Sequence, residues 1–168
     1  MRGTPRRRTF GFALGALFQS VAFLGPVLLA GCGPAAPPPP TVVVVKLVAT
    51  ADVNGSAPVA VRVYQLGSKS GFEGAEFFPL YKSDATALGS DLIKKDEVLL
   101  APGTTKTLTL SPTDAVKAIG VFAAYANYQT ATWRGDTDVP AHETTTVTAT
   151  IGASAIKVTA APGKPAGS

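Results

Sequence analysis

Residues 59–64 read Val59-Ala60-Val61-Arg62-Val63-Tyr64, and this stretch decides the fold class. Every second residue is a valine, and successive side chains of a β-strand point to opposite faces of a sheet. The three valines would therefore share one buried face, while the arginine and the tyrosine lie on the other. The pattern predicts a half-buried β-strand.

Further runs of this kind, rich in valine and threonine, lie on both sides of it. Turn-forming residues separate them, such as Asn54-Gly55-Ser56-Ala57-Pro58 and Pro102-Gly103. The predicted strands cover residues 41–52, 59–64, 97–100, 107–110, 117–125, 131–136, 144–150 and 155–159. About eight short strands at this spacing predict an all-β sandwich or barrel.

One segment interrupts the strand pattern. Ser70-Gly71-Phe72-Glu73 has the spacing of a capping box, in which the serine and the glutamate each satisfy a free backbone N–H at a helix start. The spacing predicts a short helix over residues 71–78, which Pro79 would end. We expect this insertion to cover an open edge or end of the sandwich.

The chain has one cysteine, Cys32, which follows Leu29-Ala30-Gly31 after a basic and then an apolar stretch. This arrangement is typical of a bacterial lipoprotein signal peptide, so we expect residues 1–31 to be cleaved and Cys32 to carry a diacylglycerol. A retained transmembrane helix over residues 10–29 is the alternative, since about 20 apolar residues can span a bilayer. Arg7-Arg8 leaves open whether export follows the general or the twin-arginine route.

The chain after the cleavage site is expected to have three parts. Residues 32–40 form a lipidated, proline-rich tether, residues 41–160 the sandwich domain, and residues 161–168 a disordered tail. Cleavage would remove four of the 15 basic residues and none of the 11 acidic ones, which leaves the chain close to neutral. This balance gives no reason to expect a nucleic-acid partner.

The sequence shows no catalytic constellation, no metal-ligand spacing and no cofactor motif, so we expect no enzymatic activity. His142 is interpreted as a solvated loop residue, and Asp136 and Asp138 as parts of a turn. Trp133 lies near Tyr125 and Tyr128 and could form a platform for a sugar. Aromatic residues on strands are more often core or cross-strand pairs, which is the interpretation we favour.

Five short motifs follow one another behind the cysteine. They are Tyr64-Gln65-Leu66, the aromatic residues between Phe72 and Tyr81, Leu88-Gly89-Ser90-Asp91-Leu92, Leu100-Ala101-Pro102-Gly103, and Gly120-Val121-Phe122-Ala123-Ala124-Tyr125 leading to Ala131-Thr132-Trp133-Arg134. Their order and spacing over residues 59–140 resembles the TssJ family of type VI secretion lipoproteins, also called SciN or VasD. The resemblance implies a transthyretin-like β-sandwich of two four-stranded sheets with a helical insertion. It also implies that Tyr64, Gln65, Leu66, Trp133 and Arg134 have structural roles.

The resemblance further implies a function in assembly rather than catalysis. TssJ-like proteins sit on the periplasmic face of the outer membrane and bind the periplasmic C-terminal region of TssM, which itself associates with TssL. The loop between the first two strands is implicated in that contact. Its matching residues here are Val53, Asn54, Gly55 and Ser56.

The chain departs from the family pattern between Tyr125 and Ala131. Family members tend to carry charged residues there, whereas this chain has Ala126-Asn127-Tyr128-Gln129-Thr130. Contacts made by this loop would therefore be less ionic. The alternative function is an envelope lipoprotein that binds a sugar or another small ligand through Trp133 and its neighbours.

Overall fold

The computed structural model describes residues 36–164. The predicted signal peptide, the Leu29-Ala30-Gly31 triplet and Cys32 lie outside the described residues, as do residues 165–168. The elements in chain order are β1 (Val42–Ala49), a 3-10 turn (Val53–Gly55), β2 (Val59–Leu66), α1 (Ser70–Gly74), α2 (Phe77–Leu88), a second 3-10 turn (Gly89–Asp91), β3 (Leu92–Leu100), β4 (Thr105–Leu110), β5 (Ala118–Ala123), β6 (Arg134–Asp138), β7 (Thr144–Ile151) and β8 (Ile156–Pro162).

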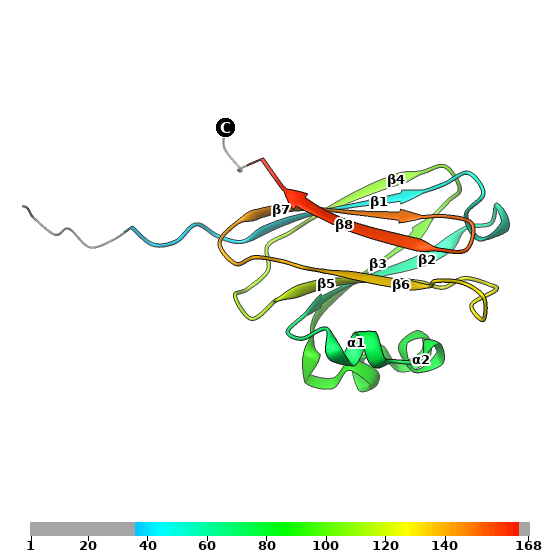
Figure 1. The fold of residues 1–168 in the computed structure, drawn as a ribbon, viewed down its shortest axis with the longest axis horizontal. Coiled ribbons are helices and arrows are strands. Elements are labelled where there is room, and N and C mark those ends of the chain that lie inside the picture. The colour runs from blue at the N-terminus through cyan, green and yellow to red at the C-terminus, as the bar shows by residue number, and fades with distance from the viewer. Residues whose placement is uncertain (1–35, 165–168) are drawn as a thin grey trace, which may run out of the picture. The chain divides into compact units, whose positions relative to one another are not determined.

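The eight strands form two facing four-stranded sheets (Figure 1). The strand order is β4-β1-β7-β8 in the first sheet and β3-β2-β5-β6 in the second. Within the first sheet, β1 pairs parallel with β7 and antiparallel with β4, whereas all pairs of the second sheet are antiparallel. The predicted all-β sandwich of eight strands in two sheets is confirmed.

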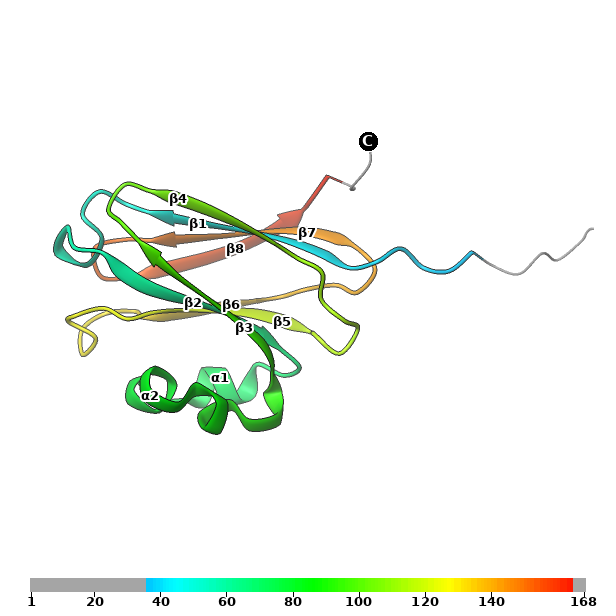
Figure 2. The same cartoon turned by 180° about the vertical axis from the view of Figure 1, so that it is seen from behind.

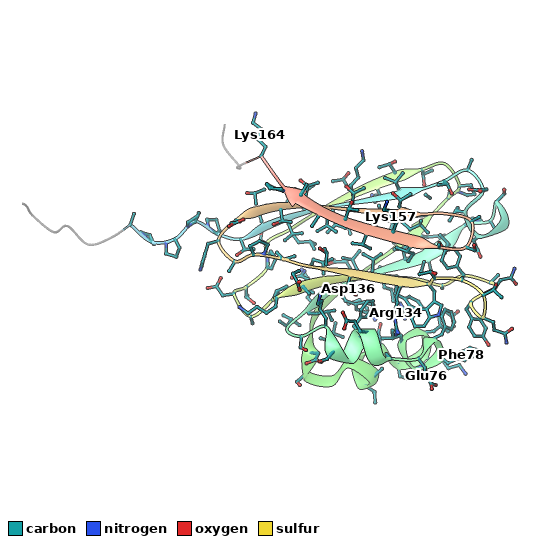
Figure 3. All side chains as sticks on the ribbon, in the orientation of Figure 1. Glu76, Phe78, Arg134, Asp136, Lys157 and Lys164 are labelled. Carbon is teal, nitrogen blue, oxygen red and sulfur yellow. The ribbon has the colours of Figure 1, made fainter. Side chains whose placement is uncertain are left out.

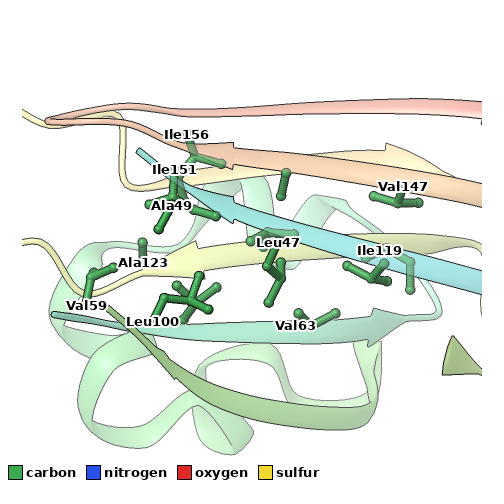
Figure 4. Close-up of a cluster of buried hydrophobic side chains, with 14 of the residues drawn as sticks. Leu47, Ala49, Val59, Val63, Leu100, Ile119, Ala123, Val147, Ile151 and Ile156 are labelled. Carbon is green, nitrogen blue, oxygen red and sulfur yellow. The ribbon is translucent and has the colours of Figure 1, made fainter. Parts of the chain in front are cut away.

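The main core lies between the inner faces of the two sheets (Figure 4). Val59, Val61 and Val63 are at most 1% exposed and point into it, as their alternation predicts. On the first sheet, Val43, Val45 and Leu47 of β1 are fully buried opposite them. Burying this apolar surface is the main source of stability, at about 25 cal/mol per Å².

The helical insertion packs on the outer face of the second sheet, as Figures 1 and 2 show from opposite sides. Here Tyr64, Leu66 and Phe122 of the sheet form a second apolar cluster with Phe72 of α1 and Leu80 of α2. The expectation that the insertion covers an edge or an end of the sandwich was wrong, because it covers a face. Val59, Val61 and Val63 of β2 therefore face the core between the sheets, and Tyr64 and Leu66 face the helices.

The predicted helix over residues 71–78 was also wrong, because there are two helices and Pro79 lies inside the second. Pro79 is the third residue of α2, where backbone N–H groups have no partner within the helix, so proline costs little there. The capping box does not form either. Helix α1 starts at Ser70 with Lys69 as its N-cap residue, and Glu73 instead lies 3.9 Å from Lys69 Nζ.

Strands β3 and β8 extend well beyond their predicted bounds. Strand β3 starts at Leu92 rather than at residue 97, and β8 continues through Ala161 and Pro162, which were expected to belong to the tail. Pro162 is opposite Thr145 of β7, and the next residue, Gly163, donates its backbone N–H to Thr144 at 2.8 Å. Within residues 36–164 no helix is long and apolar enough to cross a membrane.

Candidate functional site

The loops at one end of the sandwich form the candidate site. Residues 36–40 lead into β1 at the opposite end, so the tether and these loops are separated by the length of the strands (Figure 1). The loop end combines the β1–β2 loop (residues 50–58), the β5–β6 loop (residues 124–133) and the β7–β8 turn (residues 152–155). Strand β1 has eight residues, which corresponds to about 27 Å at 3.3–3.4 Å per residue.

Asn54 holds the β1–β2 loop in its shape. Its backbone is left-handed (φ 49°), as are those of Gly55 (φ 69°) and Ser56 (φ 62°). The Asn54 side chain donates to the Pro58 carbonyl at 3.2 Å and accepts from the Ala126 backbone N–H at 2.8 Å. This last contact joins the β1–β2 loop to the β5–β6 loop across 72 residues of sequence.

The four predicted partner-binding residues therefore have different environments. Val53 is 0% exposed and belongs to the core, so its side chain is not available to a partner in this conformation. Asn54 is half-buried and bonded to both loops, while Gly55 and Ser56 are exposed at the tip. A contact at this loop would thus use the tip, with Val53 and Asn54 as its support.

A shallow hollow of about 120 Å³ lies between the three loops. Its lining includes Asn54, Asn127, Thr130 and Ser154 and contains no charged side chain. Below it, Tyr125 donates its hydroxyl to the Gly152 carbonyl at 3.0 Å, and burial raises the pKa of this tyrosine to about 12. Small-molecule pockets usually measure about 300–1,000 Å³, so the hollow is too small to favour the ligand-binding alternative.

Trp133 does not form the open platform that a sugar would need. Its ring makes edge contacts with Phe77 (centroid distance 5.4 Å) and Phe122 (5.7 Å). The Arg134 guanidinium lies 4.7 Å from the centre of the same ring. The side chain is therefore part of the packing between the second sheet and the helices, as the preferred interpretation predicts.

The family-motif residues all make internal contacts. Tyr64 donates its hydroxyl to Asp84 of α2 at 3.1 Å, and Leu66 packs in the same cluster. Gln65 is buried on the opposite side of β2. Arg134 donates to the carbonyls of Phe72 (3.0 Å) and Ala75, at the end of α1.

Asp84 is the ionic centre of this packing. Its carboxylate accepts from Lys95 Nζ at 2.8 Å as well as from Tyr64, and Arg62 lies 3.4 Å away. Burial raises the pKa of Asp84, but the hydrogen bond and charge of Lys95, together with Tyr64 and Arg62, outweigh burial and hold it below its ordinary value. Burial likewise raises the pKa of Tyr64, so Tyr64 stays protonated and donates.

Arg62 is the main contributor that the sequence analysis missed. Its Nη1 donates to the carbonyls of Leu80 and Tyr81, both at 2.9 Å, and its Nε donates to Glu97 at 2.7 Å. The two carbonyls lie just before Ser83, where the helical backbone is interrupted (φ −151°, ψ 54°). An arginine at an outward position among the valines of residues 59–63 was the signal that could have indicated this role.

The remaining candidate groups are structural. Asp136 and Asp138 lie on β6 rather than in the expected turn, and both pair with Lys69, at 3.4 and 3.2 Å. His142 lies in a loop with its side chain 39% exposed, while its backbone N–H donates to Thr41 and its Nδ1 lies 3.1 Å from the Pro39 carbonyl. Among residues 36–164, no group of three His, Cys, Asp or Glu side chains could hold a metal ion.

These features define a class of protein: a β-sandwich binding or assembly module with a loop surface at one end and a helical insertion on one sheet. Residues 41–154 match the family model described as "Type VI secretion lipoprotein, VasD, EvfM, TssJ". The chain therefore belongs to the type VI secretion lipoprotein family, a family of structural, membrane-associated components.

Solved structures agree with this assignment. The type VI lipoprotein TssJ1 from Pseudomonas aeruginosa is 35% identical, with a TM-score of 0.71, and the match covers 75% of this chain and 100% of that chain. Serratia marcescens Lip, described as a membrane-bound component of the type VI secretion system, is 27% identical (TM-score 0.65; 70% and 96% covered).

A chain in the structure described as the TssM C-terminal domain from EAEC is 23% identical (TM-score 0.56; 73% and 98% covered), which shows the fold alone. A search of curated protein sequences finds no match.

Proposed function

We propose that this protein anchors the type VI secretion membrane complex to the outer membrane by binding the periplasmic C-terminal region of TssM. Its role is mechanical, and it catalyses no reaction. The observation that carries the proposal is the position of the loop end, which faces away from the tether by the length of the sandwich. Family membership supports the same role.

The membrane attachment rests on the sequence. Residues 1–31 act as the signal peptide, and Cys32 receives the lipid that inserts into the outer membrane. Acyl chains contribute about 0.8 kcal/mol per buried CH₂, so two or more chains give stable attachment. Residues 32–40 then act as a short tether, in which the eight residues 33–40 would span about 25 Å as a polyproline helix, so TssM must reach across the periplasm to the domain.

TssM contacts the tip of the β1–β2 loop, where Gly55 and Ser56 are exposed. The neighbouring β5–β6 loop has no charged residue between Tyr125 and Ala131, and the hollow between the loops has none in its lining. Binding therefore depends on shape and neutral hydrogen bonds more than on ion pairs. It should depend little on salt, because screening acts on exposed charges.

The test is a binding measurement between residues 36–168 and the periplasmic C-terminal region of TssM, by isothermal titration calorimetry. Ser56→Asp adds a charge at the loop tip with little backbone strain, because aspartate tolerates a left-handed conformation. We expect it to weaken binding at least tenfold, or about 1.4 kcal/mol.

Thr107→Asp is the matched control, since it adds the same charge at an exposed position of β4. It should bind like the wild type. If the wild-type domain shows no binding to this TssM region, the proposed function is wrong.

A second experiment tests the anchor. Cys32→Ser should leave a folded domain that binds TssM in vitro but does not support secretion in cells. Normal secretion by a variant shown by mass spectrometry to carry no lipid would contradict the anchoring role.

A further inference from the structure

Three aromatic side chains form an exposed surface beside the loop end. Phe78 and Tyr81 of α2 are 46% and 45% exposed, and Tyr128 of the β5–β6 loop is half-buried. Figure 3 shows Phe78 at the end of the molecule away from the tether, beside the β5–β6 loop. We call Phe78, Tyr81 and Tyr128 the aromatic surface.

The aromatic surface is held in one arrangement. Phe77, which is buried beneath it, stacks on Tyr128 (centroid distance 4.5 Å) and on Tyr81 (5.7 Å), and Phe78 meets Tyr128 edge to face at 5.0 Å. Arg62 fixes the backbone carbonyl of Tyr81. Such rigid aromatic side chains lose little conformational entropy on binding, which is why tyrosine is frequent at the energetic centres of interfaces.

The aromatic surface is continuous with the loop tip. Asn54 accepts from the backbone N–H of Ala126, and Tyr128 lies two residues further along the same loop. The β5–β6 loop therefore contacts both the β1–β2 loop, through Ala126, and α2, through Tyr128.

The loop tip alone is too small for a stable interface. A stable protein interface buries roughly 800 Å² on each partner and involves about 20–30 residues a side. Only Gly55 and Ser56 of the four predicted residues are exposed, so most of the contact area must come from neighbouring surface. The aromatic surface borders the tip through the β5–β6 loop and presents large apolar side chains.

We propose that the same periplasmic region of TssM binds across the loop tip and the aromatic surface, with the aromatic surface as the energetic centre of the interface. This inference rests on the proposed function. The matching segment of the partner is apolar, and Lys82, whose ammonium lies 5.1 Å from the centre of the Phe78 ring, borders the aromatic surface. The helical insertion thus serves recognition in addition to covering the sheet.

The test uses the same calorimetric assay on residues 36–168. Phe78→Ala and Tyr81→Ala should each weaken TssM binding about tenfold or more, and the double variant more than either. Ile93→Ala is the matched control, because Ile93 is 39% exposed on the same sheet but lies at the start of β3, paired near Leu66 at the tether end. It should bind like the wild type.

Tyr81→Lys replaces the aromatic ring by a charged side chain instead of shortening it, and it should also weaken TssM binding. Circular dichroism checks the fold of each variant. Hydrogen exchange of the wild-type domain should show residues 77–82 and 126–130 protected in the complex. Binding within twofold of wild type for the folded Phe78→Ala and Tyr81→Ala variants would overturn the inference, as would unchanged exchange in residues 77–82. If Ser56→Asp still weakened TssM binding in that case, the proposed function would stand without this inference. If the wild-type domain did not bind TssM, both the inference and the proposed function would be wrong.

Discussion

Replacing Arg62 by methionine should loosen the helical insertion without unfolding the sandwich. Methionine keeps an unbranched apolar stem but removes every hydrogen bond of the guanidinium. The loss leaves the Leu80 and Tyr81 carbonyls without their donor at the point where α2 is interrupted. It also removes one of the cations beside Asp84.

The expected cost follows from these contacts. Hydrogen bonds from a charged donor are worth about 1.5–3 kcal/mol each, and Arg62 makes two to backbone carbonyls. Its pair with Glu97, which is 49% exposed, adds no more than about 1 kcal/mol. Because these contacts share one side chain and are not additive, we expect Arg62→Met to lower the free energy of unfolding by about 2–4 kcal/mol.

Urea unfolding followed by tryptophan fluorescence measures this change. Trp133 is the only tryptophan in the chain and contacts Phe77 of α2, so its emission reports on the insertion. At a slope of about 2 kcal/mol per molar urea, typical of a small domain, this loss gives a midpoint shift of roughly 1–2 M.

Arg62→Lys should recover only part of the loss, since an ammonium lacks the planar fork that reaches Glu97 and two carbonyls together. Lys46→Met, at an exposed position of the first sheet, is the control and should change stability by less than about 0.5 kcal/mol. A change that small for Arg62→Met would refute the reasoning.

Three further predictions concern the same packing. Tyr64→Phe removes the hydrogen bond to Asp84 and should lower the free energy of unfolding in urea by about 1 kcal/mol. A loss below about 0.3 kcal/mol, roughly the error of such a measurement, would argue against that hydrogen bond. The folded-state pKa of Asp84 lies below its unfolded value near 3.9, so its ionised form stabilises the fold at neutral pH. This contribution is lost as the pH falls below about 4. Asp84→Asn should therefore be less stable than wild type at pH 7, and its stability should change less between pH 4 and 2. Gly120→Ala would place a Cβ 3.0 Å from both Leu66 and Phe72, so it should lower the melting temperature through about 1–3 kcal/mol of overpacking, and an unchanged melting temperature would show that α1 can shift freely.

The strands could be predicted from the sequence wherever one face is buried and the other is not. In β2 the valines face the core at alternate positions, and the pattern was plain. Strand β3 was shortened in the prediction because it is an edge strand, with Ile93, Lys94 and Lys95 exposed on both faces, so no alternation marks its start. Alternation of apolar and polar residues reflects burial of one face of a strand, and the start of this edge strand has little buried surface.

The helical insertion shows a different limit. Proline has no backbone N–H, so it disrupts a helix beyond the first turn, where each residue donates that N–H to a carbonyl of the preceding turn. Pro79 lies in the first turn of α2, where no such donor is required. The sequence alone does not say on which side of Pro79 a helix starts. The two helices are fixed instead by distant contacts, such as Arg134 with the end of α1 and Arg62 with α2.

The position of the β1–β2 loop in the chain could be predicted from the sequence, but the surroundings of its residues could not. The turn-forming residues 54–58 marked an exposed loop, and the resemblance to the lipoprotein family led to the prediction that this loop binds a partner. The burial of Val53 and the bond between Asn54 and Ala126 depend on which loops meet at one end of the sandwich. That information lies in the sheet topology, which short-range sequence patterns do not contain.

The pairing of β1 has a mechanical consequence. The tether enters β1 at Val42 and the β1–β2 loop leaves it after Ala49, so tension between a membrane anchor and a partner on that loop would run along the strand. Strand β1 is hydrogen-bonded on both sides, to β7 over Val42–Ala49 and to β4 over Val43–Val48. These bonds lie across the strand, so the pull loads them in shear and all at once rather than peeling them one after another. The pairing of β1 on both sides is thus suited to resist a force applied along the strand between its two ends.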